Sequence, residues 1–148
     1  MIYTSEGYLS MHSSIEGNDV MVKLDSGESV IDSIEAVCRQ YAITSGSILW
    51  AIGMIRNSEI GYFTSPQYDK TTIRERAEVV SFHGSIADDI PKLHIHVSLA
   101  IPDHTVKGGH LFSGIADPLL EIHIRKLDKI VLRRSENPKS GLKELKIE

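Results

Sequence analysis

Two histidines on one predicted strand have the side-chain type and spacing of metal ligands. Apolar and polar residues alternate over residues 93–101, so His94 and His96 share one face while the apolar residues share the other. Side chains two apart on a strand face have Cα atoms roughly 6.5–7 Å apart. Two imidazoles at that separation can converge on a single metal ion. The pair therefore forms the first half of a predicted metal site.

A third histidine follows on the next predicted strand. Residues 102–105 are typical of a turn, and the returning strand carries His110 directly after two glycines. A hairpin centred on His104 places His110 opposite Ser98, on the histidine face. A two-residue turn instead pairs His110 with Val97, on the core face, although a bulge at the glycines could absorb the difference. Both registers stay open at this point.

Zinc is the ion that this ligand set favours, because three neutral imidazoles suit zinc better than magnesium or calcium, which prefer oxygen ligands. The simpler alternative is a group of surface histidines that holds no metal. A zinc site with an open position can be catalytic, by acidifying a bound water, or structural. If the protein is an enzyme, we expect a zinc-dependent reaction on a small molecule. His83 and Glu121 are the candidate acid/base residues, provided that their strands border the three histidines.

Other catalytic motifs are absent from the sequence. It has no phosphate-binding loop, no Gly-x-Ser-x-Gly elbow and no paired-cysteine zinc motif. The single cysteine, Cys38, excludes an internal disulfide and falls on the apolar stripe of a predicted helix. We interpret Cys38 as a core residue.

The elements that must position the histidines are mostly strands. Ser29 could cap a helix whose apolar stripe extends to Tyr41. From Ser45 onward six or more strand patterns follow, two of them separated by a predicted turn at residues 56–57. This order predicts an α+β domain with a mainly antiparallel sheet and one or two helices.

Composition fits a single soluble domain. The chain has 148 residues, is 41% hydrophobic and carries a formal net charge of −4, which excludes a disordered chain. No apolar stretch approaches ~18 residues, so we expect no membrane span. The N-terminal residues lack the basic flank and apolar region of a signal peptide. We therefore expect a cytoplasmic protein.

The charges are distributed unevenly along the chain. Residues 1–124 carry 8 basic and 16 acidic side chains, whereas residues 125–148 carry 8 basic and 4 acidic ones. A basic end can bind nucleic acid through phosphate contacts. Here acidic residues interrupt the basic ones and no aromatic residue is present to stack on bases. An ordinary solvated face is the favoured interpretation.

The order of these segments is similar to that of a known domain. The His-x-His strand followed by Gly-Gly-His110 resembles the signature of the PPC (plants and prokaryotes conserved) domain. Further stretches resemble successive strands of that domain: residues 22–28, 46–55, 60–63, 82–86 and 121–124. The resemblance covers residues 20–132, which leaves an N-terminal segment, 1–19, and a basic C-terminal extension, 133–148. We expect this extension to pack on the domain or to continue it.

The resemblance implies a mainly antiparallel domain that assembles as a homotrimer, with His94, His96 and His110 as metal ligands. It also implies kinship with plant proteins that bind DNA through AT-hook segments, and prokaryotic members are often described as candidate DNA-binding proteins. This chain has no Arg-Gly-Arg-Pro hook, and its body is acidic. We therefore expect a trimeric zinc module that binds or transforms a small ligand. The alternatives are a DNA-associated regulatory protein and a trimeric interaction scaffold with a vestigial site.

Overall fold

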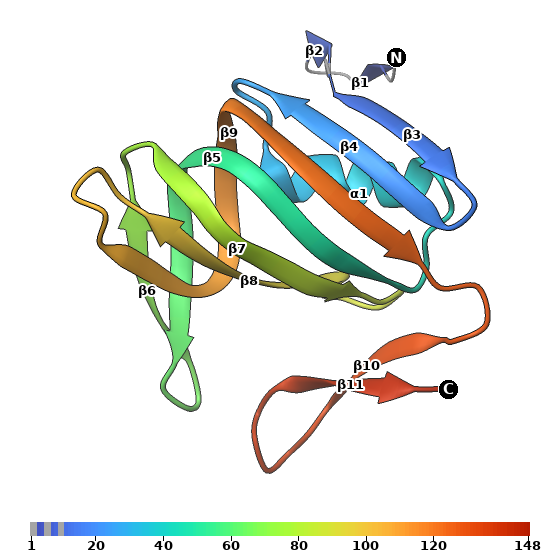
Figure 1. The fold of residues 1–148 in the computed structure, drawn as a ribbon. Helices are drawn as coiled ribbons and strands as arrows, with labels where there is room; N and C mark the ends of the chain where they lie inside the picture. Colours follow the sequence, from blue (N-terminus) through green and yellow to red (C-terminus); the bar gives the residue numbers. More distant parts are fainter. Residues whose placement is uncertain (1–2, 5–6, 9–10) are drawn as a thin grey trace.

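The computed structural model describes residues 3–4, 7–8 and 11–148, so the predicted N-terminal segment lies partly outside the described residues. One helix and a series of strands follow one another along the chain (Figure 1). In order they are β1 (Tyr3–Thr4), β2 (Gly7–Tyr8), β3 (His12–Glu16), β4 (Asp19–Asp25), α1 (Val30–Gln40), β5 (Gly46–Phe63), β6 (Tyr68–Ile73), β7 (Ala77–Ile86), β8 (Leu93–Ala100), β9 (Val106–Lys126), β10 (Leu132–Glu136) and β11 (Lys143–Ile147).

Seven of the strands form one antiparallel sheet in the order β3-β4-β9-β8-β7-β5-β6. Because β9 also pairs with β5, the strands β5, β7, β8 and β9 close into a ring. The hairpin β10–β11 forms a separate two-stranded sheet, seen below the main sheet in Figure 1. The predicted fold class, a mainly antiparallel sheet with one helix in a single domain, is confirmed.

Strand β5 joins two segments that the sequence pattern separates, and it pairs with β9, the other long strand. The predicted turn at residues 56–57 is wrong, because β5 continues through it and absorbs the irregularity as bulges between Arg56 and Glu59. Asn57 has a φ of 49°, a left-handed conformation that a short polar side chain tolerates. The register of β9 skips Pro118, which has no backbone N–H to donate, and the strand resumes at Leu119.

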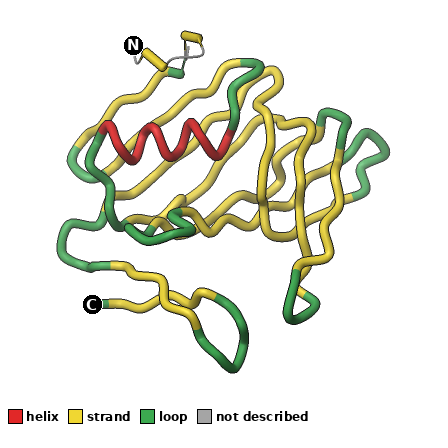
Figure 2. The backbone as a smooth tube through the Cα atoms, turned by 180° about the vertical axis from the view of Figure 1, so that it is seen from behind, coloured by secondary structure: helices red, strands yellow, loops and turns green. Residues whose placement is uncertain are grey.

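Helix α1 covers one face of the sheet, as the view from behind shows (Figure 2). Ser29 caps it, because its side chain accepts a hydrogen bond from Asp32 N. Its apolar stripe, which includes Ile34, joins the inward residues of β4 and β9 in one core. Cys38 lies in this core at 2% exposure, as predicted, and burial raises the pKa of its thiol to about 11. Among the described residues, no helix has the length and apolar run needed to cross a membrane.

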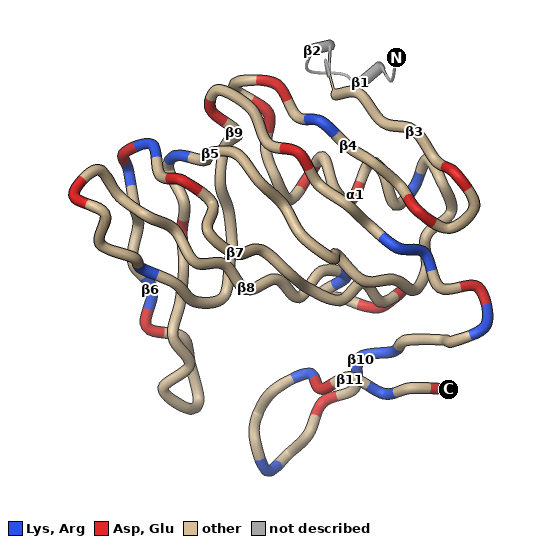
Figure 3. The backbone as a smooth tube through the Cα atoms, in the orientation of Figure 1, with Lys and Arg blue, Asp and Glu red and all other residues tan. Residues whose placement is uncertain are grey.

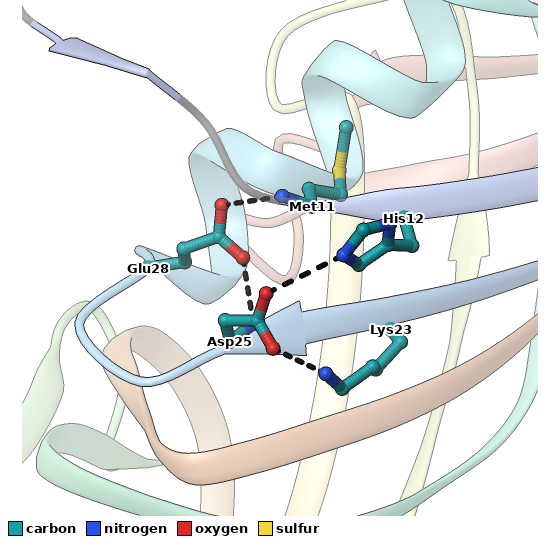
Figure 4. Close-up of polar contacts among 5 residues, drawn as sticks. All are labelled: Met11, His12, Lys23, Asp25 and Glu28. Carbon is teal, nitrogen blue, oxygen red and sulfur yellow. Dashed lines mark hydrogen bonds and ion pairs between the residues drawn. The ribbon is translucent and has the colours of Figure 1, made fainter. Parts of the chain in front are cut away.

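A buried carboxylate ties the beginning of β3 to the end of β4 (Figure 4). Glu28 is 8% exposed, and it accepts hydrogen bonds from Met11 N at 2.9 Å and from Asp25 N at 2.7 Å. The Asp25 carboxylate in turn contacts Lys23 and His12. Glu28 therefore satisfies two backbone donors at the point where the chain turns from β4 toward α1.

Replacing Glu28 with glutamine should destabilise the fold, because the new amide presents a donor to one of the two backbone N–H groups. We expect Glu28→Gln to lower the free energy of unfolding by about 1–3 kcal/mol, measured by urea denaturation. Glu75→Gln, at an exposed position, is the matched control and should leave the free energy unchanged. Equal stability of the two variants would contradict the role given to Glu28.

Candidate metal centre

Strand β8 presents two of the predicted ligands because its sequence alternates. Leu93, Ile95 and Val97 are buried, whereas His94 and His96 point to the exposed face. The next residues in the pattern, Ser98 and Leu99, continue it. The inward residues fix the strand against the core, and the two imidazoles follow from the two-residue period.

The register of the β8–β9 hairpin differs from both predicted registers. His110 lies directly opposite His96, not opposite Ser98 or Val97. A five-residue turn, 101–105, produces this register through hydrogen bonds from His104 N to Ile101 O (2.8 Å) and from Ile101 N to Thr105 O (3.0 Å). Directly opposed residues point to the same face of a sheet, so all three histidines still lie on one face.

A close approach between β9 and β5 fixes His110 from the other side. His110 is the register partner of Gly61 on β5 as well as of His96 on β8. The preceding residue, Gly109, leaves room for this contact, since a Cβ there would lie 2.5 Å from Gly61 O. His110 is thus held between two strands by backbone pairing.

The three imidazoles converge. The Nε2 atoms of His94 and His96 are 3.2 Å apart, and one ring nitrogen from each of His94, His96 and His110 lies within 4.8 Å of the others. Bonds of about 2.0–2.1 Å at tetrahedral angles place two nitrogen ligands about 3.3–3.4 Å apart. The Nε2 atoms of His94 and His96 lie close to this separation, so the residues present fit a zinc ion.

The surroundings of His94 and His110 favour the neutral imidazole, which is the form that binds a metal. The ring of His110 packs against Phe112 and Tyr68, with centroids 4.5 Å and 5.2 Å away, and its buried Nδ1 has no hydrogen-bond partner. Burial, followed by the charges of His94, His96 and Lys70, lowers the pKa of His110 to about 4. Burial is also the largest cause that lowers the pKa of His94.

The two candidate acid/base residues lie outside this cluster. His83 is the register partner of His96 on β7, but it is exposed and none of its atoms belongs to the converging set. Glu121 lies on β9 between Lys23 of β4 and Ile52 of β5. It lines a separate depression that it shares with residues of β3 and β4. Their catalytic roles remain predictions.

A cavity of about 940 Å³ opens beside the cluster and is lined by both His94 and His110. Residues of the β10–β11 hairpin, among them Leu142 and Leu145, form one of its walls. Arg134 also lines it, from the basic C-terminal extension that the sequence predicts to pack on the domain or to continue it. The signal for its burial was the alternation in β10, which puts Arg134 on the same face as Leu132.

Comparison with known proteins gives a family match over most of the chain. The family model of the Plants and Prokaryotes Conserved (PCC) domain matches residues 11–128. A curated relative, the bifunctional protein GlmU of a Synechococcus strain, is 26% identical over 128 residues, which make up 86% of this chain and 20% of that protein. The chain thus spans about a fifth of the length of the curated relatives it matches.

Solved structures share the fold closely. A protein of Bacteroides thetaiotaomicron named as a "putative dna binding protein" superposes with a TM-score of 0.84 at 26% identity, covering 92% of this chain and 96% of that one. A protein of Archaeoglobus fulgidus named as metal-containing superposes with a TM-score of 0.79 at 28% identity, covering 93% and 97%.

The lowered pKa of His110 predicts a pH dependence for protein stripped of metal. Below about pH 6.5 the unfolded chain protonates this histidine, while the folded state resists protonation until about pH 4. The free energy of unfolding should therefore fall across that interval as the pH is lowered. We expect His110→Gln to lose less stability than wild type between these pH values in urea denaturation. His12→Gln, at an exposed position, should behave as wild type; an identical loss in all three proteins would contradict the prediction.

Proposed function

Because this chain belongs to the Plants and Prokaryotes Conserved (PCC) domain family, we propose that it is a metal-binding module of that family. In this proposal His94, His96 and His110 hold a zinc ion, and the site binds or transforms a small molecule. The observation that carries the proposal is the convergence of three ring nitrogens within 4.8 Å on one sheet face. The family prediction made from the sequence is confirmed.

The chemistry of the ligand set supports zinc. Zinc is commonly bound by imidazole nitrogen, and three histidines leave a further coordination position for a ligand or substrate. A zinc ion there would act as a Lewis acid. The chain's own residues orient the site: the β8–β9 register aligns His96 with His110, and the aromatic rings of Tyr68 and Phe112 keep water from one side of His110.

Catalysis would require a residue to move a proton, and the strand register favours one candidate. His83 lies across from His96, so its side chain shares the face of a proposed ligand. Glu121 lies where β9 pairs with β4, next to Lys23.

The metal-containing relative from Archaeoglobus fulgidus supports metal binding in this fold.

Elemental analysis tests the zinc site. We expect untagged protein to bind about one zinc per chain, because three pre-arranged imidazoles bind zinc tightly. His110→Ala should bind none above background, while His83→Ala should keep its zinc. Circular dichroism of each variant checks that the fold survives. Wild-type protein that holds no metal and takes up no added zinc would overturn the proposal.

We further propose a homotrimer, supported by an apolar patch on the sheet face opposite α1. Met21 and Trp50 flank His123 on neighbouring strands, and Ile52 lies in the next row. The exposed fractions are 43% for Met21, 38% for Trp50 and 57% for Ile52. Exposed apolar side chains gathered on one face are typical of an interface between subunits.

Light scattering tests this assembly. We expect a mass near three times the 16.4 kDa of the chain for wild type, and a smaller mass for Ile52→Asp, which places a charge in the patch. Ile147→Asp, on the exposed strand β11, should remain trimeric. A monomeric wild type, or a trimeric Ile52→Asp, would contradict the proposed interface.

A DNA-associated role is the second candidate, and the name of the Bacteroides relative favours it. Figure 3 shows basic and acidic segments intermixed along the β10–β11 hairpin, the part of the chain richest in basic residues. Such mixing weakens the phosphate attraction on which DNA binding depends. The alternative requires duplex DNA to bind at low salt and to bind less after charge reversal at Lys139 and Lys146.

A cytoplasmic location remains a prediction from the sequence.

A further inference from the structure

We propose that the cavity beside the candidate metal centre binds an organic monocarboxylate, with its carboxylate on the guanidinium of Arg134 and its apolar body on the hydrophobic wall. This inference rests on the proposed function, since it assigns a ligand class to the same site. Arg134 lies beyond residues 11–128, the part matched by the family model.

Arg134 is a buried cation whose guanidinium has no ion-pair partner among residues 11–148, although the charge of Asp89 lies near it. It is 9% exposed, and its Nη2 donates to Ser85 Oγ at 2.8 Å, while its buried Nε has no hydrogen-bond partner. Within residues 11–148, no carboxylate oxygen forms an ion pair with its guanidinium. The nearby Asp89 carboxylate instead accepts a hydrogen bond from the backbone N of Arg134, at 2.8 Å.

Such a group favours an anion. Removing a cation from water is costly unless a charged or hydrogen-bonding partner compensates it. Burial lowers the pKa of the Arg134 guanidinium, and the charge of Asp89 offsets this effect only in part. A carboxylate can accept two parallel hydrogen bonds from a guanidinium.

The position of Arg134 connects the anion site to the histidines. Ser85, which accepts its hydrogen bond, is the register partner of His94 across β7 and β8. Directly opposed residues share a face, so Ser85 holds the guanidinium on the side to which His94 points. The charge of Arg134 is also one cause that lowers the pKa of His94. Arg134, His94 and His110 all line the one cavity.

The other charged side chains of the cavity wall already have partners, and they include Asp89, whose carboxylate accepts the hydrogen bond from Arg134 N. Lys92 pairs with Asp88 at 3.0 Å, and Lys143 donates to Ile90 O at 2.7 Å. Two further acids are also engaged: Glu35 with Arg39, and Glu144 with Asn137 and Ser140. Among residues 11–148 Lys143 pairs with no acid but is exposed to water, so Arg134 is the buried cation of the wall that an anionic ligand would compensate.

The remaining wall is apolar, which defines the rest of the ligand. The cavity that Arg134 lines is also lined by apolar residues, among them Leu93, Leu111, Phe112, Leu142 and Leu145. Its volume of about 940 Å³ lies within the range of small-molecule pockets. Inorganic phosphate or sulfate would leave this surface uncovered, whereas an aromatic or aliphatic acid would cover it and gain from its burial.

Benzoate is the probe, added to full-length protein stripped of metal and followed by calorimetry. We expect benzoate to bind and benzyl alcohol, which has the same ring without the charge, to bind at least about 10-fold more weakly. Arg134→Gln should weaken benzoate binding by about 10- to 100-fold. Arg133→Gln removes the same charge from the exposed face of β10 and should bind as wild type.

An NMR measurement on wild-type protein tests the carboxylate site even if Arg134→Gln disturbs the hairpin. In wild-type protein, benzoate but not benzyl alcohol should shift the NMR signal of the Arg134 Nε–H group. No binding of benzoate, equal binding of the two probes, or equal binding by wild type and a folded Arg134→Gln would overturn the inference. Zinc uptake is measured separately. If the protein binds benzoate but takes up no zinc, the result contradicts the proposed metal site and still supports the carboxylate site.

Discussion

The pairing of one residue with two neighbouring strands is the constraint on which the site depends. His110 is the register partner of His96 on one side and of Gly61 on the other, so β9 cannot slide along either neighbour without breaking a ladder of hydrogen bonds. A shift of one residue would move His110 to the core face. The converging imidazoles are thus a product of backbone pairing around the closed ring of strands, and the aromatic contacts of His110 refine a position already fixed.

The histidine face could be predicted because it depends only on local alternation. The two-residue period of β8 separates buried Ile95 from exposed His94 and His96 wherever the strand lies. The register could not be predicted, because it depends on the five-residue turn at 101–105, whose hydrogen bonds form only once the chain is folded. The same limit applies to the predicted turn at residues 56–57, where pairing with β9 keeps β5 extended and converts a turn signal into a bulge.

Arg134 illustrates a different limit of sequence analysis. Basic and acidic residues are intermixed over residues 125–148, a composition that indicates a solvated face. The burial of Arg134 comes from contacts distant in sequence, with Ser85 on β7 and Asp89 in the loop that follows. The average charge of a segment indicates how much of the segment is exposed to solvent. The chemistry of a single side chain depends on its position in the fold.

Among the described residues, the strands of the hairpin β10–β11 pair only with each other, and the hairpin docks on the main sheet through contacts that include those of Leu132 and Arg134. Its residues can therefore change without disturbing any ladder that positions His94, His96 and His110. Two parts of the molecule are in this way free to evolve at different rates. A substitution in the hairpin would change the wall of the cavity beside the histidines and leave the backbone pairing of the sheet as it is.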